Sequence, residues 1–448
     1  MMKSLRYAGL ILLVSLTLGA QHVALAQTQQ VYRLTLQDAI QRALAANVNT
    51  LLANERIAEA EGTRARRYAA AMLPRVNAQT YANVQNRDLQ AFGISAPGFP
   101  DVVGPFSNYD IRIYGQQNLI DLASYRSLKA SERALDSSKL DSQDVRDWIV
   151  RSVAEMYLVA ESATARASAA QTRVTDAETL LKLATDKHDA GSATGVDVLR
   201  AQVQLANEQQ ALLIAENARK QSLLVLARNL GLSPSVPLEL AETLRYAALA
   251  PRGPDLLVQD ALSTRADYLA LMSQRQSLVE QQRANQARWY PKLSLNGNFG
   301  GIGRNIGSMR PTGLLQGQVD VPVFDRDRDG EAQELASRVR SIDDRLADMR
   351  RGVDEEVREA LLNLDSAAQQ VEVSEQGQAL AQRELALAQD RFQEGTANNV
   401  EVVTAQDELA RAQENYILAV SSHVDAKFAL ARALGNTEKN LAAFAQGQ

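Results

Sequence analysis

Cysteine is missing from this chain of 448 residues, and only three histidines are present. The missing cysteine excludes disulfides, thiolate metal sites, a cysteine nucleophile and a lipid anchor on cysteine. Three histidines leave little material for catalysis or metal binding centred on imidazole. Glycine and proline are also scarce, at 24 and 11 residues, and aromatic residues make up 5% of the chain. This composition favours helices over a chain that is mostly membrane barrel. The net charge of −5 gives no support for nucleic-acid binding.

The N-terminus has the three parts of a secretory signal. Lys3 and Arg6 precede an apolar run from Ala8 to Ala20, and Ala24-Leu25-Ala26 supplies the small residues that a signal peptidase recognises. We therefore predict a signal peptide over residues 1–26. The run is too short to be a membrane anchor, and no later stretch reaches the ~18 apolar residues of a spanning helix. A mature chain that enters a bilayer would do so as a closed β-barrel.

Two halves of the chain repeat each other at a constant spacing. Leu119-Ile120-Asp121 recurs 204 residues later as Val323-Phe324-Asp325, and the same offset relates Leu230-Gly231 to Leu434-Gly435. These matches predict an internal two-fold repeat. The predicted halves span 31–232 and 255–435, with a proline-rich linker over 233–254 and a tail over 436–448. Each half is expected to run helix, strand, loop, strand, very long helix, turn, helix.

The longest segments without helix breakers predict two very long helices. Residues 121–190 contain neither proline nor glycine, and residues 325–394 contain no proline. Each run of 70 residues would span about 105 Å as an α-helix. Small and apolar residues recur every three or four positions, from Met156 to His188, from Ala360 to Phe392 and from Val402 to Leu430. This 3.5-residue period is typical of coiled coils, and alanine at the seam allows helices to approach closely.

Four short segments alternate polar and apolar residues as strands do: 76–84, 111–116, 293–299 and 316–321. One polar and one apolar face suit a strand of a water-filled membrane barrel, and also a solvent-facing sheet of a soluble domain. Four strands cannot close a barrel, because the smallest barrels have eight. A membrane barrel would need several chains, and three chains would supply about twelve strands.

No catalytic, metal or cofactor site emerges from the sequence, so we expect no enzyme. Asp325 to Gly330 begins like a calcium loop, but Ala336 stands where the bidentate glutamate belongs, and a charged helix cap fits better. Gly301-Ile302-Gly303 resembles a nucleotide loop without the helix that should follow, and we expect a loop between strands. His188 and His423 lie on helical seams, where packing or exposure is the expected role.

Two glycine-containing segments, 191–195 and 395–399, turn each long helix back on itself. An acidic residue follows each turn, Asp197 in the first half and Glu401 in the second. One interpretation is stabilisation of a helix N-terminus by negative charge. The other places both acids around an opening at the far end of the coiled coil. The residues alone leave both interpretations open.

The order of these motifs resembles that of the TolC-like outer-membrane efflux proteins. The resemblance spans about residues 31–435 and rests on Leu34-Thr35-Leu36-Gln37-Asp38-Ala39, Leu73-Pro74, Phe324-Asp325, the two glycine turns, Ala-Gln at 201–202 and 405–406, and the Leu-Gly pair that closes each half. It implies a mainly α fold with a small β part. Four strands per chain would form a trimeric twelve-stranded β-barrel above a long periplasmic α-helical coiled-coil barrel.

The same resemblance implies roles for the turns. The tip that meets a periplasmic adaptor would comprise Gly191, Ser192, Ala193, Gly395, Thr396 and Ala397. Asp197 and Glu401 match positions near the periplasmic aperture, although Thr404 stands where some members have a further aspartate. Many relatives carry a lipidated N-terminal cysteine, which this chain lacks.

We therefore expect a homotrimeric outer-membrane channel with a large periplasmic extension. It would be the exit duct of a tripartite efflux system, passing small molecules from an inner-membrane transporter and a periplasmic adaptor to the exterior. A duct for type I protein secretion or for metal-ion efflux is the alternative with the same fold. A soluble periplasmic coiled-coil scaffold or adaptor is the alternative from another class, and it would not need the four alternating strands.

Overall fold

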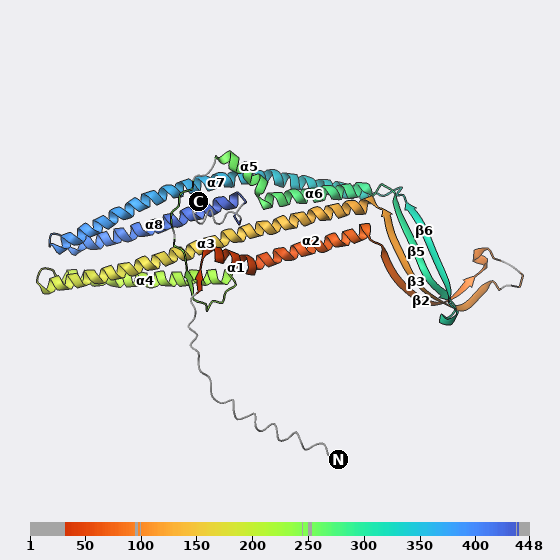
Figure 1. Ribbon diagram of the computed structural model, residues 1–448, viewed down its shortest axis with the longest axis horizontal. Coiled ribbons are helices and arrows are strands. Elements are labelled where there is room, and N and C mark those ends of the chain that lie inside the picture. Colours follow the sequence, from red (N-terminus) through yellow and green to blue (C-terminus); the bar gives the residue numbers. More distant parts are fainter. Residues whose placement is uncertain are drawn as a thin grey trace, which may run out of the picture.

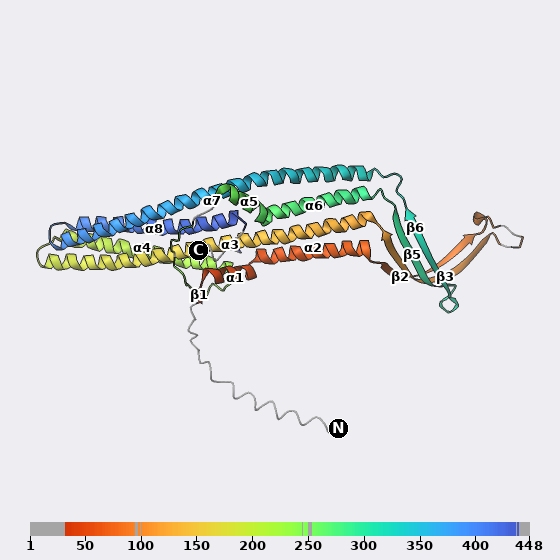
Figure 2. The same ribbon diagram turned by 45° about the horizontal axis from the view of Figure 1, so that its top comes forward.

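The computed structural model of the chain describes residues 32–94, 97–98, 100–243, 245–249, 253–435 and 437–438. The predicted signal peptide and almost all of the predicted tail lie outside these residues. The molecule is elongated, with a long layer of helices at one end and a curved sheet at the other (Figure 1, Figure 2). Its elements in chain order are β1 (Tyr32–Leu34), α1 (Leu36–Ala46), α2 (Val48–Met72), β2 (Arg75–Asp88), η1 (Gln90–Phe92), β3 (Val102–Ile120), α3 (Leu122–Asp189), α4 (Gly195–Asn229), β4 (Leu238–Leu240), α5 (Pro254–Thr264), α6 (Ala266–Ala287), β5 (Lys292–Gly303), η2 (Ile306–Ser308), β6 (Arg310–Asp320), α7 (Asp327–Gln393) and α8 (Asn399–Ala433).

The two very long helices are confirmed. Helix α3 has 68 residues and α7 has 67. Asp121 caps α3, because its carboxylate accepts hydrogen bonds from the backbone N–H and the hydroxyl of Ser124, at 3.0 and 2.7 Å. The predicted seam is buried along both helices, at Ala160, Ala163, Ala167, Ala170, Val174, Ala177 and Ala184 of α3 and at Ala360, Leu364, Ala367, Val371, Ala381, Leu385, Ala388 and Phe392 of α7. Within the described part of the chain, no helix is both long enough and apolar enough to cross a bilayer.

The single helix expected before each pair of strands is wrong, because two helices stand there in each half. Asn47 separates α1 from α2, and Arg265 separates α5 from α6, both with extended backbones at ψ 131° and 119°. The Asn47 side chain accepts a hydrogen bond from the backbone N–H of Asn49 at 2.9 Å. Asparagine thus caps α2 in place of continuing α1, as its short polar side chain favours.

Strands β2, β3, β5 and β6 form one antiparallel sheet in that order. The four predicted strands are confirmed and extend further than the alternating pattern indicated, since β3 begins at Val102 and β6 at Arg310. The register places Arg75, Gln116, Asn296 and Gln316 opposite one another across the four strands. The neighbouring row, Val76, Gly115, Gly297 and Leu315, lies on the other face. The sheet therefore has one polar and one apolar face.

The loop expected at Gly301–Gly303 is wrong, because these residues continue β5. Glycine is required beside them for a steric reason. A Cβ at Gly300 would lie 2.0 Å from the carbonyl oxygen of Ile111 on the neighbouring strand β3. Close approach of two backbones, rather than a turn, therefore accounts for glycine in this segment.

The helical layer and the sheet each have two edges, and each edge of the sheet continues into an edge of the helical layer. Helix α3 packs against α2, α4, α6 and α8, while α7 packs against α6 and α8. Helices α2 and α4 thus lie along one edge of the layer and α7 along the other (Figure 1). In the sheet, β2 and β6 are the edge strands. Because β2 follows α2 and β6 leads into α7, each edge runs from the sheet into the helices.

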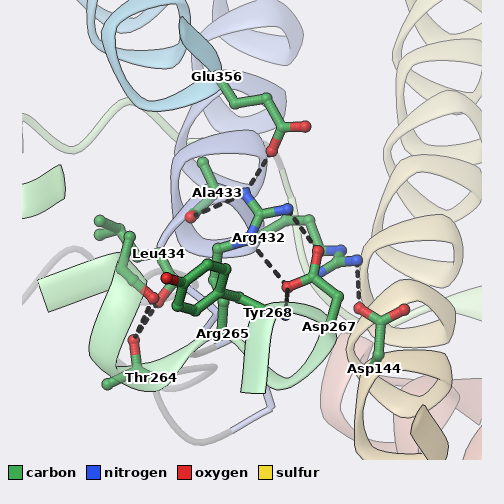
Figure 3. Close-up of polar contacts among 10 residues, drawn as sticks. Asp144, Thr264, Arg265, Asp267, Tyr268, Glu356, Arg432, Ala433 and Leu434 are labelled. Atoms are coloured by element: carbon green, nitrogen blue, oxygen red, sulfur yellow. Dashed lines mark hydrogen bonds and ion pairs between the residues drawn. The ribbon is translucent and has the colours of Figure 1, made fainter. Parts of the chain in front are cut away.

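Polar contacts at the middle of the molecule fix the end of α8. Arg265 is 5% exposed, and its guanidinium group donates to Asp267 at 2.7 Å, to Glu356 and to the carbonyl oxygen of Ala433 at 3.3 Å (Figure 3). The Thr264 hydroxyl donates to the carbonyl oxygen of Leu434 at 2.7 Å. The α5–α6 junction, α7 and the end of α8 are therefore held together by one buried cation and its neighbours.

Candidate functional site

Two glycine turns lie at the end of the molecule farthest from the sheet (Figure 1). Gly191 and Gly395 have φ of +74° and +77°, in the left-handed region where a glycine commonly ends a helix. The backbone N–H of Ser192 donates to Lys187 O at 2.8 Å, and that of Thr396 donates to Arg391 O at 3.0 Å. The two turns therefore share one geometry. Of the six predicted tip residues, Ala193 and Ala397 are half-buried, and the remaining four, Gly191, Ser192, Gly395 and Thr396, are exposed.

The two turns are bonded to each other across the chain. The Lys187 ammonium group on α3 donates to the carbonyl oxygens of Phe392 at 2.6 Å and Gln393 at 3.0 Å, both at the end of α7. It also lies 5.0 Å from the centre of the Phe392 ring. In the return direction, the buried Asn399 side chain on α8 donates to the carbonyl oxygen of Asp197 at 3.0 Å. These contacts join the α3–α4 turn to the α7–α8 turn.

An apolar core beneath these bonds packs the same four helices together. It consists of Leu180 and Ala184 of α3, Ala201 of α4, Leu385, Ala388 and Phe392 of α7, and Val402 and Ala405 of α8. All eight side chains are less than a tenth exposed. Packing and hydrogen bonds thus give this end of the molecule one fixed arrangement.

Asp197 acts first as a helix cap. Its carboxylate accepts hydrogen bonds from the backbone N–H of Thr194 at 3.0 Å and from the Thr194 hydroxyl at 2.7 Å, which completes a capping box at the start of α4. Arg200 lies 3.8 Å away. The hydrogen bonds from Thr194 lower the pKa of the Asp197 carboxyl below its ordinary value. Its charge is therefore compensated locally, as the helix-start interpretation expects.

Glu401 is in a different position. It is 43% exposed, and its carboxylate pairs with Arg391 of α7 at 2.9 Å. The cap of α8 comes instead from Asn398, whose side-chain oxygen accepts from the backbone N–H groups of Val400 and Glu401 at 3.1 and 3.3 Å. The carboxylate of Glu401 is thus free of the helix terminus and lies on the surface near the turn.

Sequence reasoning missed the two side chains that join the turns, Lys187 and Asn399. One signal was present in the repeat. The offset of 204 residues relates Lys187 to Arg391, which is also a basic residue in the last turn of a long helix. Nothing in the sequence indicated that Lys187 would reach across to α7 rather than its own helix end. The predicted tip residues are brought together by these two contacts.

The polar face of the sheet holds a second set of connected side chains. Asp110 is 1% exposed and accepts a hydrogen bond from the Tyr81 hydroxyl at 2.7 Å and one from the Arg112 Nε at 2.6 Å. Arg112 also donates to the side-chain oxygen of Asn298 at 3.4 Å. Because Asp110 neutralises Arg112, this part of the polar face carries no net charge.

The segment that resembled a calcium loop forms ion pairs within the chain. Arg288 lies 2.9 Å from Asp325, 3.3 Å from Asp327 and 2.6 Å from Glu331, and Arg328 lies 3.3 Å from Asp325. Arg328 also stacks on the ring of Trp289 at 3.3 Å. Across the described ranges, no three His, Cys, Asp or Glu side chains come close enough together to hold a metal ion.

Comparison with known proteins gives consistent matches along most of the chain. The family model of outer membrane efflux proteins matches residues 39–232 and 257–436. The pyoverdine export outer membrane protein OpmQ of Pseudomonas aeruginosa is 27% identical over 420 residues, which cover 89% of this chain and 85% of that protein. The toluene efflux pump outer membrane protein TtgF of Pseudomonas putida is 23% identical over 388 residues, which cover 83% of this chain and 77% of that protein.

A solved structure shows the same fold. The outer membrane protein VceC of Vibrio cholerae superposes with a TM-score of 0.74 at 18% identity, over 89% of this chain and 96% of that chain.

Proposed function

This chain belongs to the outer membrane efflux protein family and is an outer-membrane efflux channel, and we propose that three copies form the exit duct of a tripartite pump. The observation that carries the proposal is the pair of open edges on each layer of the chain. In the described sheet, the outer sides of β2 and β6 have no partner strand. Such edges expose backbone donors and acceptors that another strand can satisfy.

The strand directions allow closure by identical copies. The four strands are antiparallel in the order β2, β3, β5, β6, so the first and last run in opposite directions. Strand β6 of one copy can therefore pair antiparallel with β2 of the next, in a head-to-tail contact that closes a ring. Two copies would reach the smallest known barrel of about eight strands, and three reach about twelve, which leaves space for a channel.

The helical edges carry matching apolar stripes. On α7, Leu362, Val373, Leu380 and Leu387 are 64–71% exposed and follow one another at 11, 7 and 7 residues. This spacing is that of a coiled-coil seam without its partner. On α4, at the opposite edge, Leu199, Val203, Leu213 and Ile214 are 60–69% exposed. Contact between α7 of one copy and α4 of the next would cover both stripes and extend the ring below the sheet.

The two faces of the sheet suit a conduit through a membrane. The face with Arg75, Gln116, Asn296 and Gln316 would line a water-filled lumen, and the face with Val76 and Leu315 would meet lipid. The neutralised Asp110–Arg112 pair lies on the polar face. Such a duct passes cargo by offering a continuous polar path and performs no chemistry.

At the helical end, we propose that the two glycine turns meet a periplasmic adaptor. Their exposed positions, Gly191, Ser192, Gly395 and Thr396, lie in the turns at the end of the described chain opposite the sheet, where a partner can reach them (Figure 1). Asp197 and Glu401 would lie near the aperture of the duct, with Glu401 the more accessible of the two acids. An inner-membrane transporter would supply cargo through the adaptor.

The relatives suggest which cargo to test first. OpmQ is named for pyoverdine export and TtgF for toluene efflux. We therefore propose small organic molecules as cargo, with a secreted siderophore as the first candidate and an aromatic solvent as the second. A duct for protein secretion or metal ions is the alternative, and export of those cargoes by the same strain would favour it.

The test begins with the purified protein in detergent. Its mass should be that of three chains, and it should conduct ions in a planar bilayer. A strain that lacks the gene should retain the siderophore inside the cell or lose its resistance to solvent. The wild-type gene should restore siderophore export or solvent resistance. A monomer recovered from the soluble periplasm without detergent would contradict the proposal.

The aperture residues need a separate comparison. Glu401→Gln should change cation selectivity more than Asp197→Asn, because the Asp197 carboxylate already accepts hydrogen bonds from Thr194 whereas Glu401 is more exposed. Glu239→Gln, which removes an exposed acid on β4 in the middle of the molecule, is the matched control. Unchanged selectivity in both tip variants would leave Asp197 with its helix-capping role and Glu401 with its ion pair to Arg391 alone.

A further inference from the structure

The connection from β6 to α7 exposes an unusual set of side chains. Val323 and Phe324 are 88% and 81% exposed, and Val321 is 58% exposed. Directly before them, Asp320 ends β6, and its carboxylate accepts a hydrogen bond from the Gln318 amide at 2.7 Å. Apart from the half-buried Pro322, the side chains of this segment, residues 320–324, are exposed, although large apolar side chains in water are unfavourable.

The opposite edge of the molecule has a pocket at the same level. It lies where α2 ends and β2 begins, has a volume of about 400 Å³ and is walled on its apolar side by Ala69, Ala70, Leu73 and Pro74. Arg66 and Arg75 line its polar side. Among the described residues, neither guanidinium group has an ion pair or a hydrogen-bond acceptor.

Asp320 on one edge strand and Arg75 on the other lie at the same end and on the same face of the sheet. Asp320 is the last residue of β6 and Arg75 the first of β2, so both lie at the end of the sheet that joins the helices. The register connects Arg75 through Gln116 and Asn296 to Gln316, and Asp320 lies four residues further along the same strand. Because side chains alternate between faces, Asp320 and Arg75 lie on the same face of the sheet.

We propose that residues 320–324 of one copy dock in the α2–β2 pocket of the next copy. Phe324 enters the pocket against its apolar wall, where the flanking guanidinium groups can stack on its ring. Asp320 pairs with Arg75 across the junction between β6 and β2. The inference rests on the proposed head-to-tail ring and adds the contact that sets how neighbouring copies align.

A second copy suits this pocket better than a lipid does. The segment offers an aromatic ring and a carboxylate, and the pocket offers an apolar wall and unpaired cations. The edge strands on which they lie also need partners, and pairing β6 of one copy with β2 of the next would bring the two surfaces to the same junction. One contact of this kind would occur at each junction of the ring.

The absence of cysteine makes a direct test possible. In the full-length protein, Phe324→Cys combined with Ala70→Cys should give a covalent trimer on a non-reducing gel after oxidation, since a disulfide needs Cα atoms within about 7 Å. The matched control pairs Phe324→Cys with Ala58→Cys, which moves the second thiol about 18 Å along α2. This control should remain monomeric on the gel.

A charge exchange tests the polar half of the contact. Arg75→Asp and Asp320→Arg should each make the trimer dissociate about tenfold more readily, equivalent to about 1.4 kcal/mol, and the double exchange should restore it. Phe324→Ala should loosen the trimer by at least as much, while Phe324→Tyr should keep it.

The outcomes separate this contact from the assembly itself. A protein that is trimeric by mass but gives no cross-link from Ala70→Cys overturns the proposed docking and leaves the ring intact. Failure of the double exchange to restore the trimer overturns the Asp320–Arg75 pair. A protein that is monomeric by mass in detergent overturns the ring and the docking together.

Discussion

Gly435, two residues after the end of α8, is a position at which one added methyl group should disrupt the helical layer. Its φ is +70°, and a Cβ there would lie 2.7 Å from Arg265 Cα and 2.9 Å from Arg265 N. Gly395, in the turn after α7, has a similar φ of +77°, but a Cβ there meets nothing within 4 Å. Gly435→Ala and Gly395→Ala therefore share the backbone strain and differ in the steric overlap.

The shared strain is about 1–2 kcal/mol, the cost of a left-handed backbone for a residue other than glycine. The overlap at Gly435 adds about 1–3 kcal/mol, as forcing an extra carbon into a packed region does. Arg265 cannot move aside easily, because Asp267, Glu356 and the carbonyl oxygen of Ala433 hold it (Figure 3). We expect Gly435→Ala to lose about 2–5 kcal/mol and Gly395→Ala about 1–2 kcal/mol.

Hydrogen exchange with peptide resolution measures both effects in the intact protein. Gly435→Ala should lose protection at the end of α8 and at the α5–α6 junction, whereas Gly395→Ala should lose it at its own turn. Thermal melting by circular dichroism should rank the variants in the same order. Equal melting temperatures, with protection at the α5–α6 junction unchanged in both variants, would refute the reasoning from the Arg265 contact.

Three further predictions concern charge and the helix edge. Burial, with Glu242 nearby, raises the pKa of Glu161 to about 8. Between about pH 4 and 8 the folded state therefore holds a proton that the unfolded state has lost, and the stability of the protein falls as the pH rises through this range. Glu161→Gln should stabilise the protein at pH 8–9 by at most about 5 kcal/mol, seen as a higher melting temperature, and should have no effect near pH 4. The hydrogen bonds from Thr194 lower the pKa of Asp197, so the stabilisation of α4 by Asp197 is present above the unfolded pKa of about 4 and is lost as the pH falls through the folded pKa. Hydrogen exchange at the start of α4, corrected for its intrinsic pH dependence, should rise as the pH falls through the folded pKa. Exchange that does not change with pH there would contradict the capping role. Leu380→Glu on the α7 stripe should shift the purified protein from trimer toward monomer by at least about tenfold in dissociation constant, measured by light scattering, while the exposed Glu375→Gln on the same helix should not.

The long helices and their turns were predictable because their signals are local. A run without proline or glycine, a 3.5-residue period and a glycine at the helix end each act within a few residues of the chain. The buried positions of α3 and α7 follow the predicted seam from Ala160 to Ala184 and from Ala360 to Phe392. The split at Asn47 and Arg265 was missed, since one extended residue interrupts a helix without removing its helix-forming neighbours.

The strand limits and the tip contacts were not predictable for a different reason. Gly300 to Gly303 offer no alternating pattern, and their role depends on a neighbouring strand almost 190 residues away in the chain. Lys187 and Asn399 likewise act on partners more than 200 residues distant. A sequence indicates which residues can donate a hydrogen bond, but the packing of distant helices decides which acceptor each one meets.

The bonds between the two turns have a mechanical consequence for the duct. Lys187 and Asn399 connect the α3–α4 turn to the α7–α8 turn in both directions, over a shared apolar core. The helical end of each chain therefore behaves as one stiff body with two tips. A motion that widens this end must swing the four helices together, or first break the bonds of Lys187 and Asn399. A trimer would then have three moving parts at its mouth, and the stiffness of each would depend on one lysine and one asparagine.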